Sequence, residues 1–287
     1  MRRRRRWWRL LARAVMSVPM YALLTASAAV ILFPLYLTVV DSLQPLEKLL
    51  TFPPGSRPDF WPDDPLWSNY RAALTDIPMR RYLLNSLIMA SIITTGQLVT
   101  SALAAYAFAF LRFPFRTPLF FLFLSTMMVP WEVSIIPNFQ TIQRLDWLDT
   151  YQGLTVPFLA TAFGTFLLRQ HFLTLPQELK DAADIEGYGN LRFLLFVVVP
   201  LSRAALATLA VFSFLQAWNQ YLWPLLVTNE PDMRTVQIGI AALQAEEVQR
   251  TNVVLAGTIV ALLPMLLLVV VFQRFLVRGL TAGAVKG

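Results

Sequence analysis

The sequence predicts an all-α integral membrane protein with six transmembrane helices. Of its 287 residues, 56% are hydrophobic and only 14% are charged, whereas soluble domains are about 45–50% apolar and about 25% charged. Six stretches are long and apolar enough to cross a bilayer, which takes about 20 residues because the hydrocarbon offers the backbone no water. These stretches are residues 18–40, 82–110, 117–139, 151–168, 204–227 and 253–272.

The basic residues predict how these helices cross the membrane. Residues 2–6 are all arginine, and with Arg9 and Arg13 they precede the first apolar stretch. Because such clusters stay on the cytoplasmic side, next to anionic lipid headgroups, the N-terminus is predicted inside. An even number of spans returns the C-terminus to that side. We expect residues 1–17 to form a basic cytoplasmic segment and residues 18–287 a single transmembrane domain. The net charge of +7 then indicates contact with the lipid bilayer and not with nucleic acid.

The connections on the opposite side are predicted to be irregular. The longest, residues 41–81, is rich in Pro, Trp and Asp and should be turn-rich. Shorter connections are expected near residues 145–150 and 229–252. The chain has no cysteine, no G-x-x-x-x-G-K-[ST] phosphate loop and no constellation of acid, base or metal ligands. It is therefore not expected to be an enzyme, nor to hydrolyse ATP itself.

Glu132 is the one carboxylate that the sequence places well inside a predicted span, between Pro130 and Pro137. A charge at the centre of a membrane helix costs about 2.5–3.5 kcal/mol on insertion scales, so such a residue usually faces protein or water. Two interpretations remain open. Glu132 lines a translocation pathway, or it is an interfacial carboxylate that caps a helix or pairs with an arginine.

The end of the fifth predicted span carries four polar or amphipathic side chains in succession, Trp218, Asn219, Gln220 and Tyr221. Trp and Tyr suit an aromatic belt at the membrane surface. The amides of Asn219 and Gln220 need hydrogen-bond partners and are costly against lipid. This pattern favours a cavity or a subunit interface, and we take all four as candidate pathway residues. Prolines inside most of the spans also favour a transporter.

The connection between the fourth and fifth spans, residues 169–200, is predicted to contain a short helix followed by a turn. Leu175 and Pro176 can start the helix, and Glu178 and Asp181 place negative charge near the positive end of its dipole. Gly187 permits the turn. An apolar segment, residues 191–199, then leads to Pro200.

This connection resembles the EAA loop in the permease subunits of bacterial ABC importers. The family pattern is Glu-Ala-Ala, Asp-Gly and a later Pro. Here it reads Asp181-Ala182-Ala183, Glu186-Gly187 and Pro200, with each carboxylate exchanged for the other. Residues 218–226 (WNQYLWPLL) and the tail 272–287 are similar to the sugar-type members of this family. More narrowly, residues 31–36, 84–90, 148–155 and 165–170 resemble its glycerol-3-phosphate members.

The resemblance implies a function and a set of partners. It implies an inner-membrane importer subunit in which the loop couples the spans to an ATPase. The coupling residues would be Glu178, Asp181, Ala182, Ala183, Glu186, Gly187 and Pro200. The implied partners are a second homologous permease subunit, two ATPase subunits that bind ATP and Mg, and an extracytoplasmic solute-binding protein. This chain itself would bind no cofactor. The implied substrate is glycerol-3-phosphate or a glycerophosphodiester, with a sugar as the alternative. A secondary transporter is less favoured, since it needs titratable groups in mid-span and only Glu132 approaches that.

Overall fold

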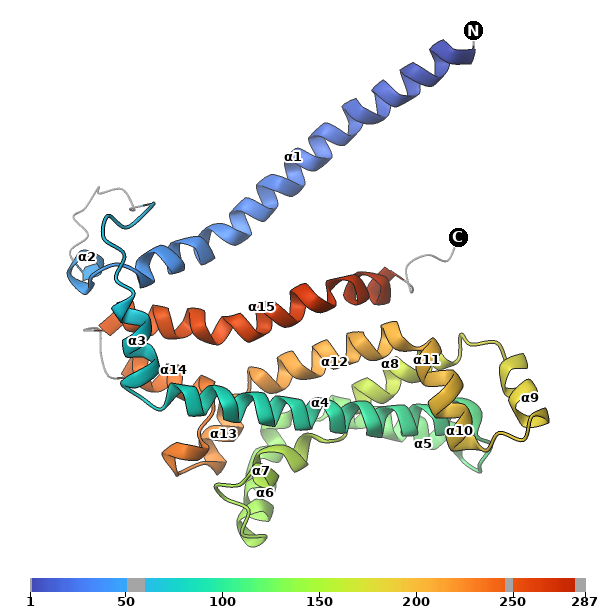
Figure 1. The fold of residues 1–287 in the computed structure, drawn as a ribbon. Helices are drawn as coiled ribbons and strands as arrows, with labels where there is room; N and C mark the ends of the chain where they lie inside the picture. Colours follow the sequence, from blue (N-terminus) through green and yellow to red (C-terminus); the bar gives the residue numbers. More distant parts are fainter. Residues whose placement is uncertain (1, 51–59, 246–249, 282–287) are drawn as a thin grey trace. The chain divides into compact units, whose positions relative to one another are not determined.

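The computed structural model describes residues 2–50, 60–245 and 250–281, and within these ranges the chain is helical without any strand (Figure 1). Residues 52–55 of the predicted turn-rich connection and the tail after Thr281 lie outside the described residues. The helices in chain order are α1 (Arg2–Ser42), α2 (Leu46–Leu50), α3 (Ser68–Thr75), α4 (Met79–Phe110), α5 (Arg116–Ser125), the 3-10 turn η1 (Thr126–Met128), α6 (Trp131–Arg144), α7 (Tyr151–Thr155), the 3-10 turn η2 (Val156–Phe158), α8 (Ala162–Phe172), α9 (Glu178–Ile185), α10 (Asn190–Phe193), the π-helix η3 (Leu194–Val198), α11 (Val199–Leu201), α12 (Arg203–Trp218), α13 (Leu222–Val227), the 3-10 turn η4 (Pro231–Met233), α14 (Val236–Ala245) and α15 (Thr251–Thr281).

The chain divides into two compact units. The first comprises Met1–Ala73 and Leu243–Val260, and the second comprises Leu74–Ala242 and Ala261–Gly287.

The first unit is held together by buried amides. The Asn69 side chain donates to the carbonyls of Ser42 (2.9 Å) and Gln44 (3.1 Å). Its own oxygen accepts from the Asn252 amide at 3.1 Å. These bonds satisfy polar groups that would be costly to bury unpaired. The connection after α1 is therefore not wholly irregular, because α2 and α3 lie within it.

Helix α1 continues the basic N-terminal residues directly into the first apolar stretch. Between Val18 and Leu35 its large apolar side chains are exposed. A contiguous apolar surface of this kind indicates contact with lipid or with another subunit.

The second unit is built on α4, with α8 and α12 packed along it. Gly164 of α8 lies where the three helices meet. A Cβ atom there would stand 2.4 Å from Ser101 Oγ of α4 and 3.1 Å from a methyl group of Leu209 in α12. A contact of 2.4 Å is shorter than real Cβ atoms make, and 3.1 Å is unusually tight, so the absence of a side chain at Gly164 is what allows this close approach.

Three predicted spans are uninterrupted helices, and three are bent. Among the described residues, Val18–Ser42, Met79–Phe110 and Thr251–Gln273 are each long and apolar enough to cross a membrane. The others correspond to helix pairs bent by 93°, 46° and 83°. The pairs are Arg116–Met128 with Trp131–Arg144, Tyr151–Phe158 with Ala162–Phe172, and Asn190–Leu201 with Arg203–Trp218. The number of six spans stays a prediction. It holds if each bent pair of helices crosses the membrane as one span.

Three predicted spans are wrong as single helices. The third breaks at Pro130, which has no N–H to continue the preceding turn. The fourth is interrupted at residues 159–161, between η2 and α8. The fifth ends at Trp218, and the short helix α13 follows a break at Asn219 and Gln220. Apolar composition does not report where a helix is interrupted.

Two of the predicted short connections lie together within the second unit. The Asp149 carboxylate accepts the backbone N–H groups of Asn229 (2.6 Å) and Glu230 (2.8 Å), and the Asp149 N–H donates to the carbonyl of Val227. Residues 145–150 and the start of 229–252 therefore lie next to each other. The prediction that 229–252 is a short loop is wrong, because α14 lies within it.

Candidate functional site

Helix α9 ends in a Schellman cap at the predicted turn. The N–H of Gly187 donates to the carbonyl of Asp184 (3.1 Å), and that of Tyr188 donates to Ala183 (2.8 Å). Gly187 has φ = +75°, in the left-handed region that costs a residue with a Cβ about 1–2 kcal/mol. The turn that the sequence predicts at Gly187 is confirmed.

Helix α9 presents one face to solvent. Glu178, Asp181, Ala182 and Ile185 are exposed at positions i, i+3, i+4 and i+7, and Glu186 follows one turn after Ala182. Ile185 is 88% exposed and lies between these carboxylates on the same face. Figure 1 shows α9 beyond the ends of α4 and α12. The loop thus offers carboxylates around an apolar centre, a surface suited to another protein.

The opposite face of α9 is packed on the helical bundle. Ala183 is only 6% exposed and belongs to a buried cluster with Tyr106 of α4 and Phe193 of α10. Lys180 pairs with Asp184 and lies 5.6 Å from the centre of the Phe193 ring. Of the predicted coupling residues, Ala183 therefore contacts the bundle, whereas the carboxylates and Ala182 face outward.

Pro200 lies half-buried in the segment that returns from α9 to α12. It cannot donate a backbone hydrogen bond, and the turn before it is a π-helix in which the Val199 N–H donates to Leu194, five residues earlier. The chain then bends by 83° into α12. Pro200 therefore shapes the return from the loop and is not part of its exposed face.

A cavity of about 480 Å³ lies in the second unit, between α4, α6, η2, α12 and α13. Its polar lining comes from Gln97, Glu132, Thr161, Ser213, Gln216 and Gln220. Aromatic side chains line the remainder, among them Trp131, Phe158, Tyr221 and Trp223. No lining residue is basic. Such a cavity can hydrogen-bond hydroxyl groups and stack on a flat apolar surface.

The structure separates the predicted pathway residues into two groups. Glu132, Gln220 and Tyr221 line the cavity, and the Gln220 Oε1 has no hydrogen-bond partner in the described part of the chain. Trp218 is only 1% exposed and stacks on Phe214 with ring centres 5.7 Å apart. Asn219 bonds to the carbonyl of Leu215. Trp218 and Asn219 are not among the lining residues.

The position of Glu132 leaves both interpretations from the sequence open, the helix cap and the pathway residue. It stands in the first turn of α6, where the helix dipole favours a carboxylate. It also lines the cavity. No ion pair to Glu132 is present among the described residues.

Gln97 is the central residue that sequence reasoning missed. Its Nε2 donates to the carbonyl of Phe158 (2.9 Å), and its Oε1 accepts from Ser213 Oγ (2.6 Å). Thr100 donates to the next carbonyl, that of Leu159, at 2.8 Å. The backbone hydrogen bonds of the helix stop between η2 and α8. Side chains of α4 therefore donate to the carbonyls that have lost their backbone donors. An amide in an otherwise apolar stretch was the available signal.

Known proteins similar to this chain decide its family. Residues 97–282 match the family described as "Binding-protein-dependent transport system inner membrane component". This chain belongs to that family. Membership makes it a membrane component of an ABC importer and implies ATPase and binding-protein partners. Its relatives are transport permeases, which agrees with a non-catalytic subunit. Among the described residues, no cluster of His, Cys, Asp or Glu could hold a metal ion.

Individual members of the family align over nearly the whole chain. The sn-glycerol-3-phosphate transport system permease protein UgpE of Pectobacterium atrosepticum is 40% identical over 91% of this chain and 94% of its own length. UgpE of Yersinia enterocolitica is 41% identical over the same shares. UgpE of Brucella abortus is 38% identical over 93% and 97%.

A solved structure shares the fold. One chain of a bacterial ABC transporter involved in the import of the acidic polysaccharide alginate superimposes with a TM-score of 0.79. The match covers 92% of this chain and 97% of that chain, at 22% identity. The ABC importer permease architecture is therefore confirmed.

Proposed function

We propose that this chain is one of two homologous membrane subunits of an ATP-driven importer for glycerol-3-phosphate or a glycerophosphodiester. The observation that carries the proposal is the 38–41% identity to UgpE proteins along nearly the whole chain. The second subunit, two ATPase subunits and an extracytoplasmic binding protein complete the importer. In this proposal residues 18–287 form one permease domain.

The proposed topology has six spans and both termini in the cytoplasm, with α9 on the cytoplasmic side. Arginines at the α9 end of the second unit support it. Arg169 Nε donates to the carbonyl of Phe108 (3.2 Å), and its guanidinium lies 4.1 Å from the centre of the Phe120 ring. Arg112, in the connection between α4 and α5, and Arg116, the first residue of α5, lie at the same end. Basic residues favour the cytoplasmic side.

The proposed coupling assigns different roles to the two faces of α9. Glu178, Asp181, Ala182 and Glu186 contact the ATPase subunit. Ala183 fixes the helix on the bundle, while Gly187 and Pro200 set the shape of the loop. Because ATP and Mg bind on the ATPase subunits, this chain binds no cofactor. Closure of the ATPase dimer then displaces α9 and shifts the spans between inward- and outward-facing states.

The cavity favours recognition of hydroxyl groups by this subunit. Gln216 and Gln220 offer amides, Thr161 offers a hydroxyl, and no lining residue is basic. A phosphate would need cations or several donors, so we assign that contact to the second permease subunit. The same absence of positive charge favours the alternative, in which the substrate is a neutral sugar.

An uptake assay with the reconstituted importer tests the function. Proteoliposomes that contain the complex and its binding protein are given labelled glycerol-3-phosphate, a glycerophosphodiester or a disaccharide. We expect ATP-dependent uptake of the first two. Uptake of the disaccharide alone would replace the proposed substrate by the sugar alternative. Uptake that persists after inactivation of the ATPase subunits would instead indicate a secondary transporter.

A further inference from the structure

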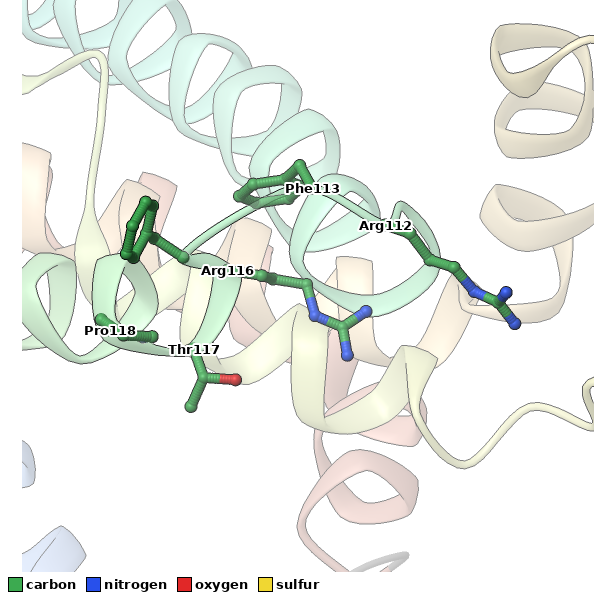
Figure 2. A pocket seen from close by; sticks show the side chains of 6 residues that line it. Arg112, Phe113, Arg116, Thr117 and Pro118 are labelled. Carbon is green, nitrogen blue, oxygen red and sulfur yellow. The ribbon is translucent and has the colours of Figure 1, made fainter.

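The loop between α4 and α5 carries a basic site that the coupling and the cavity do not use. A surface pocket of about 380 Å³ is lined by Arg112, Phe113, Phe115, Arg116, Thr117 and Pro118. Figure 2 shows the two guanidinium groups and the Thr117 hydroxyl extending to the same side of the loop. None of the lining residues is acidic, and no ion pair to either arginine occurs among the described residues.

The donors of this pocket are held in place and left available. Arg116 Nη1 donates to the carbonyl of Leu111 at 3.0 Å, which fixes the direction of that guanidinium. Its other N–H groups remain free to bind an anion. Helix α5 begins at Arg116, and no side chain caps it. The first N–H groups of a helix have no partner within the helix. Here only those of Arg116 and Thr117 add donors beside the arginines, because Pro118 has no N–H and Leu119 donates to the carbonyl of Phe115.

The apolar residues of the pocket favour a lipid over a soluble anion. Phe115 is 76% exposed and has φ = +57°, a conformation that a bulky residue adopts only under constraint. Phe113 anchors the loop by packing on Phe108, with ring centres 5.8 Å apart. The span Met79–Phe110 ends immediately before the loop, so the pocket lies at the level of the membrane surface.

We propose that this loop binds an anionic phospholipid. Arg112, Arg116 and Thr117 hold its phosphate, and Phe115 contacts its acyl chains. Exposed apolar side chains of α5, including Phe121 and Leu122, continue the acyl contact towards the bilayer. A basic residue next to an anionic lipid surface strengthens binding about fivefold. A soluble phosphate would gain nothing from these apolar residues.

Lipid titration of the purified complex tests the proposal. The complex is isolated through a tag on this chain, and bound lipid is counted by native mass spectrometry with phosphatidylglycerol or phosphatidylcholine. We expect the wild type to prefer phosphatidylglycerol. The double variant Arg112→Gln with Arg116→Gln should bind it about 25-fold more weakly, from about fivefold for each charge. Arg144→Gln removes an exposed arginine of α6 and should not change binding.

A second variant separates lipid from phosphate. Phe115→Gly removes the acyl contact and relieves the left-handed conformation, so the chain should fold normally. We expect this variant to bind phosphatidylglycerol more weakly than the wild type. Inorganic phosphate added to the wild-type complex should not displace the lipid. Equal binding of both lipids by the wild type would overturn the proposal. So would displacement by inorganic phosphate, or loss of the ATPase subunits from the double variant with lipid binding intact.

Discussion

Substitution of Gly187 isolates the contribution of backbone conformation to the coupling loop. No atom lies within 4 Å of a Cβ built on this residue, so within this chain a side chain here meets no steric obstacle. The φ of +75° is the only penalty. For alanine it costs about 1–2 kcal/mol, which is a factor of about 5–30 in the population of the capped loop. Valine should cost more, because its branched Cβ tolerates this region least. Asparagine should cost least, since it visits the left-handed region readily.

Hydrogen exchange and transport measure this series together. The Tyr188 N–H closes the Schellman cap on Ala183, so its protection should fall about 5–30-fold in Gly187→Ala. Uptake per ATP hydrolysed should decline in the order Gly, Asn, Ala, Val, while the midpoint of thermal unfolding stays nearly constant. The reasoning is wrong if Gly187→Asn uncouples transport as strongly as Gly187→Val. That result would mean that coupling depends on the size of the side chain next to a partner subunit, and not on the backbone conformation at position 187.

Three further substitutions and one control test the hydrogen bond at the break after η2, the helix packing and the docking of the ATPase subunits. Gln97→Leu leaves the Phe158 carbonyl unpaired and should lower the free energy of unfolding by about 1–3 kcal/mol, measured as reduced thermal stability in detergent. Gly164→Ala places a Cβ 2.4 Å from Ser101 Oγ and should cost about 1–3 kcal/mol by overpacking. Gly189→Ala, with no atom within 4 Å, should be nearly neutral, and equal losses in both would refute the packing argument. Asp181→Lys should weaken co-purification of the ATPase subunits, most at low salt, without changing thermal stability; undiminished co-purification would exclude the exposed face of α9 from docking.

Local chemistry made the coupling loop predictable from the sequence. Pro176 and the acidic residues after it mark the start of α9, and Gly187 marks its end, because each residue type has a strong and local backbone preference. The buried position of Ala183 was not predicted. Which side of a short helix is packed depends on contacts with other helices, with Phe193 of α10 and with Tyr106 of α4, which is distant in the sequence.

The cavity was only partly predictable for a similar reason. Glu132 was identified because a charge within an apolar stretch is conspicuous, whereas Gln97 carries no charge and was passed over. Trp218 was assigned to the pathway by its neighbours, yet it is buried against Phe214. The positions of the lining residues follow from the bend at Pro130 and the break after Trp218, and how helices are set at a break depends on tertiary packing.

The bonds of Gln97 limit which parts of the cavity wall can move. They tie α4 to η2 and to α12, so these elements behave as a rigid body whose internal displacement would break hydrogen bonds. The junction between η1 and α6 receives no hydrogen bond from another helix among the described residues. Trp131 meets its neighbours there only through ring contacts, which can slide at little cost. Residues 129–130 are thus the least tethered point of the cavity wall, and a shift there would move α6 and Glu132 with it.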